Sequence, residues 1–351
     1  MIGKNGRLPA MEGLRAYAVT LVFFVHSLDA FNRSAFSANL NRIRLKNLND
    51  YLEIINLIMF RSHYGVDLFF LLSGFLIYKV INKKDFKYIT FISNRAKRIY
   101  PAFLFSFSIY FILRTIITHE IPFDVSTILK NLLFLNGIPG YQKFPLYNHV
   151  TWSLFFEFSF YVIMPITYFS LRMNNPYRLI ALLVTVFSIG ALTNHTFTRY
   201  AMFIVGALLA SFSKDELKLA SHAIPDIAVI LIYMLATLTF SFVYSFQKFI
   251  PIYSLASSLL FINSVYGTGI LNKFFSLNIL RYLGNISYSF YLMHLLSIYF
   301  SMNFIVAHLN TELTSLRFII FITSAFFLTI IISSISFLLM EKPYFKRKIS
   351  T

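Results

Sequence analysis

The sequence predicts an all-α polytopic membrane protein with about ten transmembrane helices. Of its 351 residues, 57% are hydrophobic and only 13% are charged, and the mean hydropathy is +0.67. Soluble domains rarely combine these values, whereas proteins with many membrane-spanning helices usually do. The 42 Phe and 22 Tyr residues fit the lipid-facing surfaces and interfacial belts of such a protein.

Ten apolar runs are candidate membrane spans. They lie near residues 12–30, 64–81, 99–118, 150–171, 177–193, 199–213, 225–244, 249–267, 284–306 and 315–339. With both termini cytoplasmic, 20 of the 31 Lys and Arg residues fall on the inner side. The positive-inside rule therefore favours this orientation. The first outer loop, residues 31–63, is also basic, which suits an anionic or sugar-rich partner.

The net charge of +17 comes from basic residues scattered between the apolar runs. Without a basic domain, we interpret these residues as topology signals and contacts with anionic membrane lipids, not as a nucleic-acid site. The chain has no cysteine, so His, Ser, Tyr, Asp or Glu must do any covalent chemistry. We expect no metal site and a single integral-membrane domain, residues 1–351, without an appended soluble domain.

Arg15 and His26 lie eleven residues apart in the first span. In a helix this spacing separates them by roughly 16 Å along one face, about half of the hydrocarbon core. A cation at the membrane edge and an imidazole near mid-depth indicate a polar path into the bilayer. The alternative is a boundary arginine and a histidine that is hydrogen-bonded in the interior.

Asp67 lies near the outer end of the second span, where a carboxylate needs a partner. We expect it to orient and charge-stabilise His26, as a carboxylate does for a catalytic histidine. A helix cap at the interface is the alternative. Gly74, in the interior of the same span, indicates close helix packing.

Arg95 and Arg98 are three residues apart, so they share a helix face at the predicted cytoplasmic end of the third span. One guanidinium group can bind two phosphate oxygens at once. Together with Arg15, these residues are candidates to hold a phosphorylated cofactor. Ordinary positive-inside charge is the alternative.

The fourth span contains Ser153, Glu157 and Tyr161 at positions i, i+4 and i+8, which form one polar stripe on an aromatic helix. A buried glutamate without a partner is costly, so we expect Glu157 to face a cavity. Trp152, the only tryptophan, lies near His149 and is a candidate to stack on a sugar ring. A belt residue at the membrane interface is the alternative for Trp152.

A second polar stripe begins the ninth span, with Ser287, Tyr291 and His294 at positions i, i+4 and i+7. These side chains either contact a substrate or form hydrogen bonds in the core. Glu341, Lys342 and Pro343 end the last span and indicate a boundary with a local ion pair.

These motifs, in this order, resemble the membrane-bound acyltransferase family 3, which comprises ten-helix bacterial enzymes that O-acylate cell-surface glycans. The resemblance extends from about residue 7 to residue 348. It rests on Arg15 and His26, on the segments GVDLFFLLSGFLI, WSLFFE and GNISYSFYLMH, and on the Arg95 and Arg98 pair before a proline.

The resemblance implies acyl transfer from cytoplasmic acyl-CoA, most often acetyl-CoA, to a hydroxyl group of a surface or lipid-linked glycan. Arg15, Arg95 and Arg98 would bind the CoA phosphates. His26 would act as general base or acyl carrier, oriented by Asp67 or Glu157. The acceptor would contact substrate-binding residues on the outer side or in the interior, namely His149, Trp152, Ser153, Tyr291 and His294. The implied location is the bacterial inner membrane.

Two other functions use similar residues. A transporter of a small metabolite also needs intramembrane His, Glu and Arg, but the sequence has no repeated halves. A polytopic glycan polymerase or ligase would need its key arginines on the outer side, whereas Arg95 and Arg98 are predicted on the inner side. The sequence does not define the acceptor, the acyl chain or the oligomeric state.

Overall fold

The computed structural model describes residues 8–36, 64–119, 124–135, 138, 148–192, 195–243, 246–308 and 314–343. Across these residues all regular structure is helical and there is no β-strand. The predicted all-α class is therefore confirmed. Most of the basic outer loop, and both chain ends with their basic residues, lie outside the described residues.

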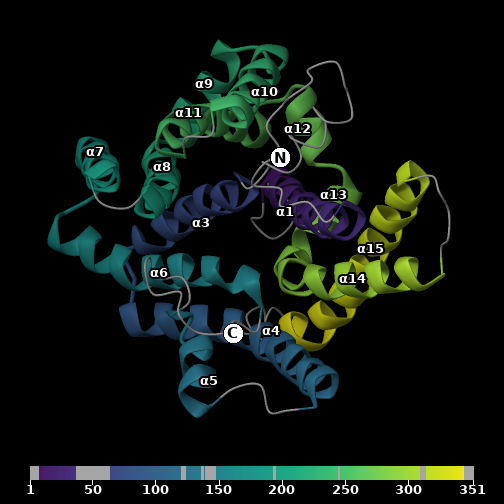
Figure 1. Cartoon of the computed structure of the whole chain (residues 1–351). Helices are drawn as coiled ribbons and strands as arrows, with labels where there is room; N and C mark the ends of the chain where they lie inside the picture. The colour runs from purple at the N-terminus through teal and green to yellow at the C-terminus, as the bar shows by residue number, and fades with distance from the viewer. Residues whose placement is uncertain are drawn as a thin grey trace. The chain divides into compact units, whose positions relative to one another are not determined.

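Each of the ten predicted spans coincides with a helix (Figure 1). These helices are α1 (Pro9–Phe36), α3 (Gly65–Ile81), α4 (Tyr88–Thr118), α6 (Trp152–Ser170), α7 (Pro176–Leu192), α8 (Tyr200–Ser211), α10 (Asp226–Val243), α11 (Phe246–Tyr266), α14 (Ser287–His308) and α15 (Thr314–Ser336). Shorter elements join them: α5 (Val125–Leu132), η4 (His149–Thr151), η5 (His195–Arg199), α9 (Lys214–Ala223), α12 (Ile270–Phe275), α13 (Asn278–Asn285) and η6 (Phe337–Glu341).

Five helices in the described residues are long and apolar enough to cross a membrane. They comprise Pro9–Phe31, Tyr88–Ile117, His149–Ser170, Phe249–Tyr266 and Leu316–Glu341. A sixth span results if α9 and the first part of α10, which meet at a bend of 85°, count as one broken span. The protein is thus a polytopic membrane protein, and the number ten and the sidedness of the termini stay predictions.

The chain divides into two compact units, each assembled from segments that are distant in the sequence. The first unit comprises Met1–Ala18, Val66–Ala96 and Phe123–Asn285. The second comprises Val19–Gly65, Lys97–Pro122 and Ile286–Thr351. The chain passes between the units within α1 and within α4.

Helix α8 is the centre of the first unit, because most of its residues are buried. Phe203 is fully buried and stacks at 4.4 Å on both Phe70 of α3 and Phe160 of α6. Two glycines allow α3 and α8 to approach this closely. A Cβ on Gly74 would overlap the carbonyl oxygen of Phe203, and one on Gly206 would overlap a backbone carbonyl of α3. The predicted packing role of Gly74 is therefore confirmed.

The first turns of α1 are fixed within the same unit. Glu12 forms an ion pair with Arg281 of α13 at 3.0 Å, and a Cβ on Gly284 would overlap the Glu12 carbonyl. A Cβ on Gly13 would likewise overlap the carbonyl oxygen of Phe275 in α12. These contacts fix the start of α1 just before Arg15.

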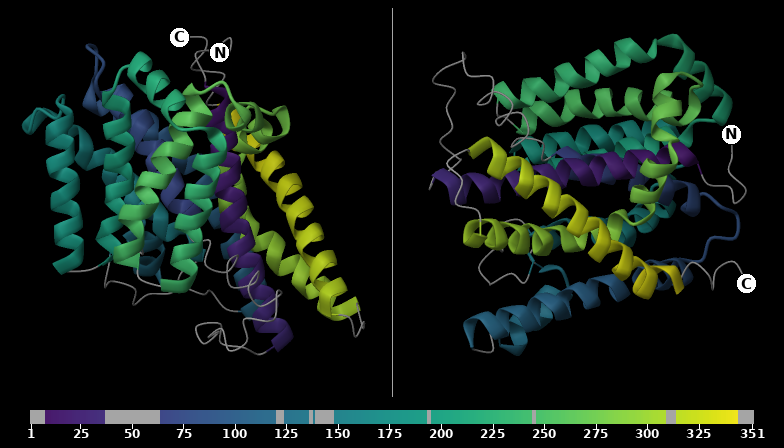
Figure 2. Two further views of the ribbon diagram at one scale, coloured as in Figure 1. Left: turned by 90° about the horizontal axis from the view of Figure 1, so that it is seen from above. Right: turned by 90° about the vertical axis from the view of Figure 1, so that its right-hand side faces the viewer.

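Helices α14 and α15 pack side by side in the second unit (Figure 2). Phe23 of α1 is fully buried against this pair, in edge contacts with Phe290 at 5.9 Å and with Phe326 at 5.2 Å. The hydroxyl of Tyr110 in α4 donates to the Leu292 carbonyl at 3.3 Å. Parts of α1 and α4 are thereby joined to α14, the helix that carries the second polar stripe.

A turn of π-helix, η6, ends the last apolar helix. Its final residue, Glu341, is buried, whereas Lys342 is exposed. The Glu341 carboxylate accepts a hydrogen bond of 2.6 Å from the Ser289 hydroxyl and one of 3.2 Å from the Ser289 backbone N–H. An acidic group at a helix N-terminus is favourable, and this one holds the first turn of α14. The sequence alone indicates only a helix boundary with a local ion pair here.

Candidate active site

Arg15 and His26 lie on one unbroken helix, α1, and both side chains are half-buried. The helical spacing therefore places them on one face, roughly 16 Å apart along the axis. The predicted helix is confirmed, while the roles of the two residues stay predictions.

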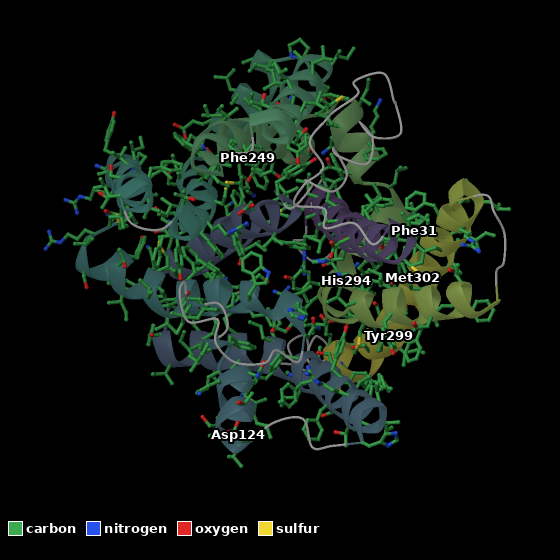
Figure 3. The ribbon with its side chains drawn as sticks, in the orientation of Figure 1. Phe31, Asp124, Phe249, His294, Tyr299 and Met302 are labelled. Carbon is green, nitrogen blue, oxygen red and sulfur yellow. The ribbon has the colours of Figure 1, made fainter. Side chains whose placement is uncertain are left out.

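His26 lies beside His294 of α14 within the second unit. The ring centroids are 5.2 Å apart and the ring planes are inclined by 40°. His294 is fully buried, and Figure 3 shows it on α14, the helix that also carries Tyr299 and Met302. The structure thus brings together two histidines that the sequence placed 268 residues apart.

The tautomer of His294 follows from its surroundings. Its Nδ1 lies 2.7 Å from the backbone carbonyl oxygen of Tyr291. A carbonyl oxygen only accepts, so Nδ1 carries the proton, and in the neutral ring Nε2 has the free lone pair. This Nε2 is buried and has no hydrogen-bond partner among the described residues. The Tyr291 ring is buried next to the imidazole, at 5.9 Å between centroids.

Asp67 of α3 is fully buried and forms an ion pair with Arg199 in the first unit. One guanidinium nitrogen donates to both carboxylate oxygens, at 2.8 and 2.9 Å. The structure therefore gives Asp67 an arginine partner, which sequence analysis did not identify. The proposed action of Asp67 on His26 stays a prediction.

The same arginine also contacts Trp152. The Arg199 guanidinium carbon lies 4.8 Å from the centre of the indole, in a cation–π contact. One face of the indole is therefore covered by Arg199, so a stacking sugar would have to use the other face. Nearby, Ser153 is buried and donates to the Val150 carbonyl at 3.3 Å, while His149 is exposed.

Glu157 of α6 is the acceptor in a small polar cluster. The Tyr161 hydroxyl donates to its Oε1 through a short hydrogen bond, and the Ser73 hydroxyl of α3 donates to the same oxygen at 3.4 Å. The predicted stripe of Glu157 and Tyr161 on one helix face is thus confirmed, and Ser73 extends it to a second helix. The cluster satisfies a carboxylate that would otherwise be costly inside a membrane protein.

Arg95 packs against this cluster. Its guanidinium lies 5.6 Å from the Tyr161 ring centre and 5.2 Å from that of Phe91. Planar guanidinium groups favour such aromatic faces, and packing there orients the hydrogen-bond donors of Arg95. Arg98 lies on the same face of α4 and is half-buried, whereas Lys97 between them is exposed.

Among the described residues, no group of three or more His, Cys, Asp or Glu side chains is arranged to hold a metal ion. Several of the predicted site residues lie in three clusters: His26 with His294, Asp67 with Arg199 and Trp152, and Glu157 with Tyr161, Ser73 and Arg95.

Residues 8–338 match the family model of an acyltransferase domain. The chain belongs to the acyltransferase 3 family. No curated protein and no solved structure matches the chain. Family membership makes acyl transfer the general chemistry of this chain, and the resemblance noted in the sequence is confirmed at this level.

Proposed function

We propose that this acyltransferase moves an acetyl group from cytoplasmic acetyl-CoA to a hydroxyl of a cell-surface or lipid-linked glycan, in the bacterial inner membrane. The observation that supports it best is the α1 face that carries Arg15 and His26, with a second imidazole beside His26. Such a face suits a long donor that has phosphates at one end and a reactive thioester at the other.

The reaction needs one proton transfer and one exchange of bonds. In the proposal, His26 takes the proton from the acceptor hydroxyl, whose oxygen attacks the thioester carbonyl. The new ester C–O bond forms, the C–S bond breaks, and the proton passes to the CoA thiolate. A site with little water would also protect the thioester from hydrolysis. Covalent transfer through an acyl-His26 intermediate is the variant of this scheme.

The other residues have distinct proposed roles. Arg15, Arg95 and Arg98 bind the CoA phosphates, and the aromatic support under Arg95 favours a fixed guanidinium plane. Asp67 and Glu157 act as catalytic carboxylates, and the hydroxyls of Tyr161 and Ser73 hold the Glu157 carboxylate in place. The face of Trp152 opposite Arg199, with His149, Ser153 and Tyr291, contacts the acceptor.

The test uses purified protein in nanodiscs with radiolabelled acetyl-CoA and an extracted surface-glycan fraction. We expect wild type to bind donor and label the glycan, Arg95→Ala to lose donor binding, and His26→Ala to bind donor without transfer. Lys97→Ala, an exposed neighbour of Arg95, is the matched control and should behave as wild type. If wild type binds no acetyl-CoA, the acetyl-CoA proposal is wrong, and longer acyl thioesters and transport assays come next.

A further inference from the structure

The buried Nε2 of His294 is a hydrogen-bond acceptor without a partner among the described residues, on a ring that lies beside His26. Its lone pair faces no described donor, and leaving a buried polar atom unpaired is costly. An unpaired buried atom of this kind calls for an explanation, such as a catalytic role, a water or an ion. The His26 ring lies beside His294, at 5.2 Å between centroids.

We propose that His294 is a positioning residue for His26. A small rotation of the His26 ring brings one of its N–H groups to Nε2 of His294, and the Tyr291 carbonyl holds His294 in the tautomer that can accept this bond. The other nitrogen of His26 then carries its lone pair and takes the proton from the acceptor hydroxyl. The relay therefore runs from the Tyr291 carbonyl through His294 to His26.

The carboxylates that the sequence offered for this role have other partners in the structure. Both oxygens of Asp67 accept from Arg199, and Glu157 accepts from Tyr161 and Ser73. A neutral imidazole orients a second imidazole without adding a buried charge. This inference deepens the proposed function, on which its catalytic step rests.

The first readout does not depend on acetyl-CoA or on any glycan. Diethylpyrocarbonate acylates an imidazole nitrogen that carries a lone pair, and mass spectrometry measures the rate at His26. We expect His294→Leu, which has no acceptor, to slow this modification roughly 10- to 100-fold, the size of effect known for the outer-shell partners of metal-binding histidines. His294→Gln restores most of the rate, because its amide donates to the Tyr291 carbonyl and its oxygen accepts from His26.

The second readout separates positioning from acceptor binding. With labelled donor and glycan, His294→Leu should lower kcat by a similar factor and leave the KM of both substrates unchanged. Tyr299→Phe, an exposed position on the same helix, is the control and should match wild type in both assays. The unfolding temperature of each variant is also measured, to show that the variant is folded.

An unchanged modification rate in a folded His294→Leu variant overturns the positioning role, and so does a raised acceptor KM with unchanged kcat. If the modification rate falls as expected while no variant and no wild type transfers acetyl groups, the positioning role stands and the proposed acetyl-CoA reaction is wrong. If His294→Leu does not fold, the modification rates at His26 are compared between His294→Gln, His294→Asn and wild type. Equal rates in all three proteins overturn the dependence on acceptor geometry.

Discussion

One nitrogen of Arg199 donates to both carboxylate oxygens of Asp67, and the side chain of Asp67 is fully buried while that of Arg199 is 13% exposed. Two opposite charges this deep in a protein lose most of their hydration. Their mutual attraction and their shared hydrogen bonds compensate for the loss only while both are present. The stability of the protein should therefore depend on the presence of both side chains.

Removing either partner alone should be strongly destabilising. Asp67→Ala or Arg199→Ala leaves one buried charge uncompensated, at a cost of about 3–5 kcal/mol in the free energy of unfolding. The double variant should lose much less than the sum of the two, since neither charge remains. Thermal unfolding in detergent measures all four proteins. Additive losses would show that the two side chains do not stabilise each other.

Gly74 supports a second stability prediction. In Gly74→Ala the new methyl group meets the backbone carbonyl of Phe203, so α3 and α8 must separate, and overpacking of this kind costs about 1–3 kcal/mol. Gly190→Ala is the matched control, because there the methyl meets chiefly the Thr198 side-chain methyl instead of a backbone carbonyl. We expect a clear drop in unfolding temperature for Gly74→Ala and a smaller one for Gly190→Ala. The reverse order would contradict the close approach of the two helices.

We expect Glu341 to contribute to both stability and acyl transfer, although it lies at the end of the last helix. Glu341→Ala removes the acceptor of the buried Ser289 backbone N–H, which costs about 1–3 kcal/mol, while the Ser289 hydroxyl keeps the Ser336 hydroxyl as a partner at 3.0 Å. Because Ser289 lies in the first turn of α14, acyl transfer should fall as well as stability. Lys342→Ala, next in the chain and exposed, should leave both unchanged. Equal behaviour of the two variants would rule out this role of Glu341.

The helices were predictable because their signal is local. Apolar runs of sufficient length predict membrane helices without knowledge of any neighbour. The starts were less predictable: α4 begins at Tyr88, eleven residues before the expected span, because Arg95, Lys97 and Arg98 separate its first turns from the apolar run. Division of α1 and α4 between two compact units is a tertiary property that hydropathy does not contain.

The site residues were predictable only where one helix holds them. Glu157 and Tyr161 share a face by helical periodicity alone, so their contact follows from spacing. Arg199 was missed because its partner Asp67 is 132 residues away. One signal was present: on the predicted topology both residues begin spans on the outer side, so opposite charges lie at the same depth. The pairing of His26 with His294 needed the fold.

The cap of α5 allows a pH prediction outside the spans. Hydrogen bonds from the Thr127 side chain and backbone N–H lower the pKa of Asp124 from its ordinary value of 3.8. A depressed folded-state pKa means that the cap stabilises α5 at every pH above 3.8 and loses its effect only as the pH falls through the lower value. Hydrogen exchange of the α5 amides, corrected for intrinsic rates, should therefore show protection that persists below pH 3.8.

Asp124→Asn is the control for this cap, because an asparagine caps a helix without titrating. Its α5 protection should not change across the same acidic range. Loss of wild-type protection already above pH 3.8 would mean that the Thr127 hydrogen bonds do not hold the carboxylate in its charged form.

Tyr161 separates the two roles proposed for its cluster, since its hydroxyl donates to Glu157 while its ring supports Arg95. Tyr161→Phe removes only the hydroxyl. If Glu157 is a catalytic carboxylate, kcat should fall several-fold and the KM for acetyl-CoA should stay unchanged, because the Arg95 platform remains. Tyr161→Ala removes the ring as well and should also raise the KM for acetyl-CoA. Steady-state kinetics with labelled donor measure both constants, and a raised donor KM in Tyr161→Phe would assign Glu157 to donor binding instead of catalysis.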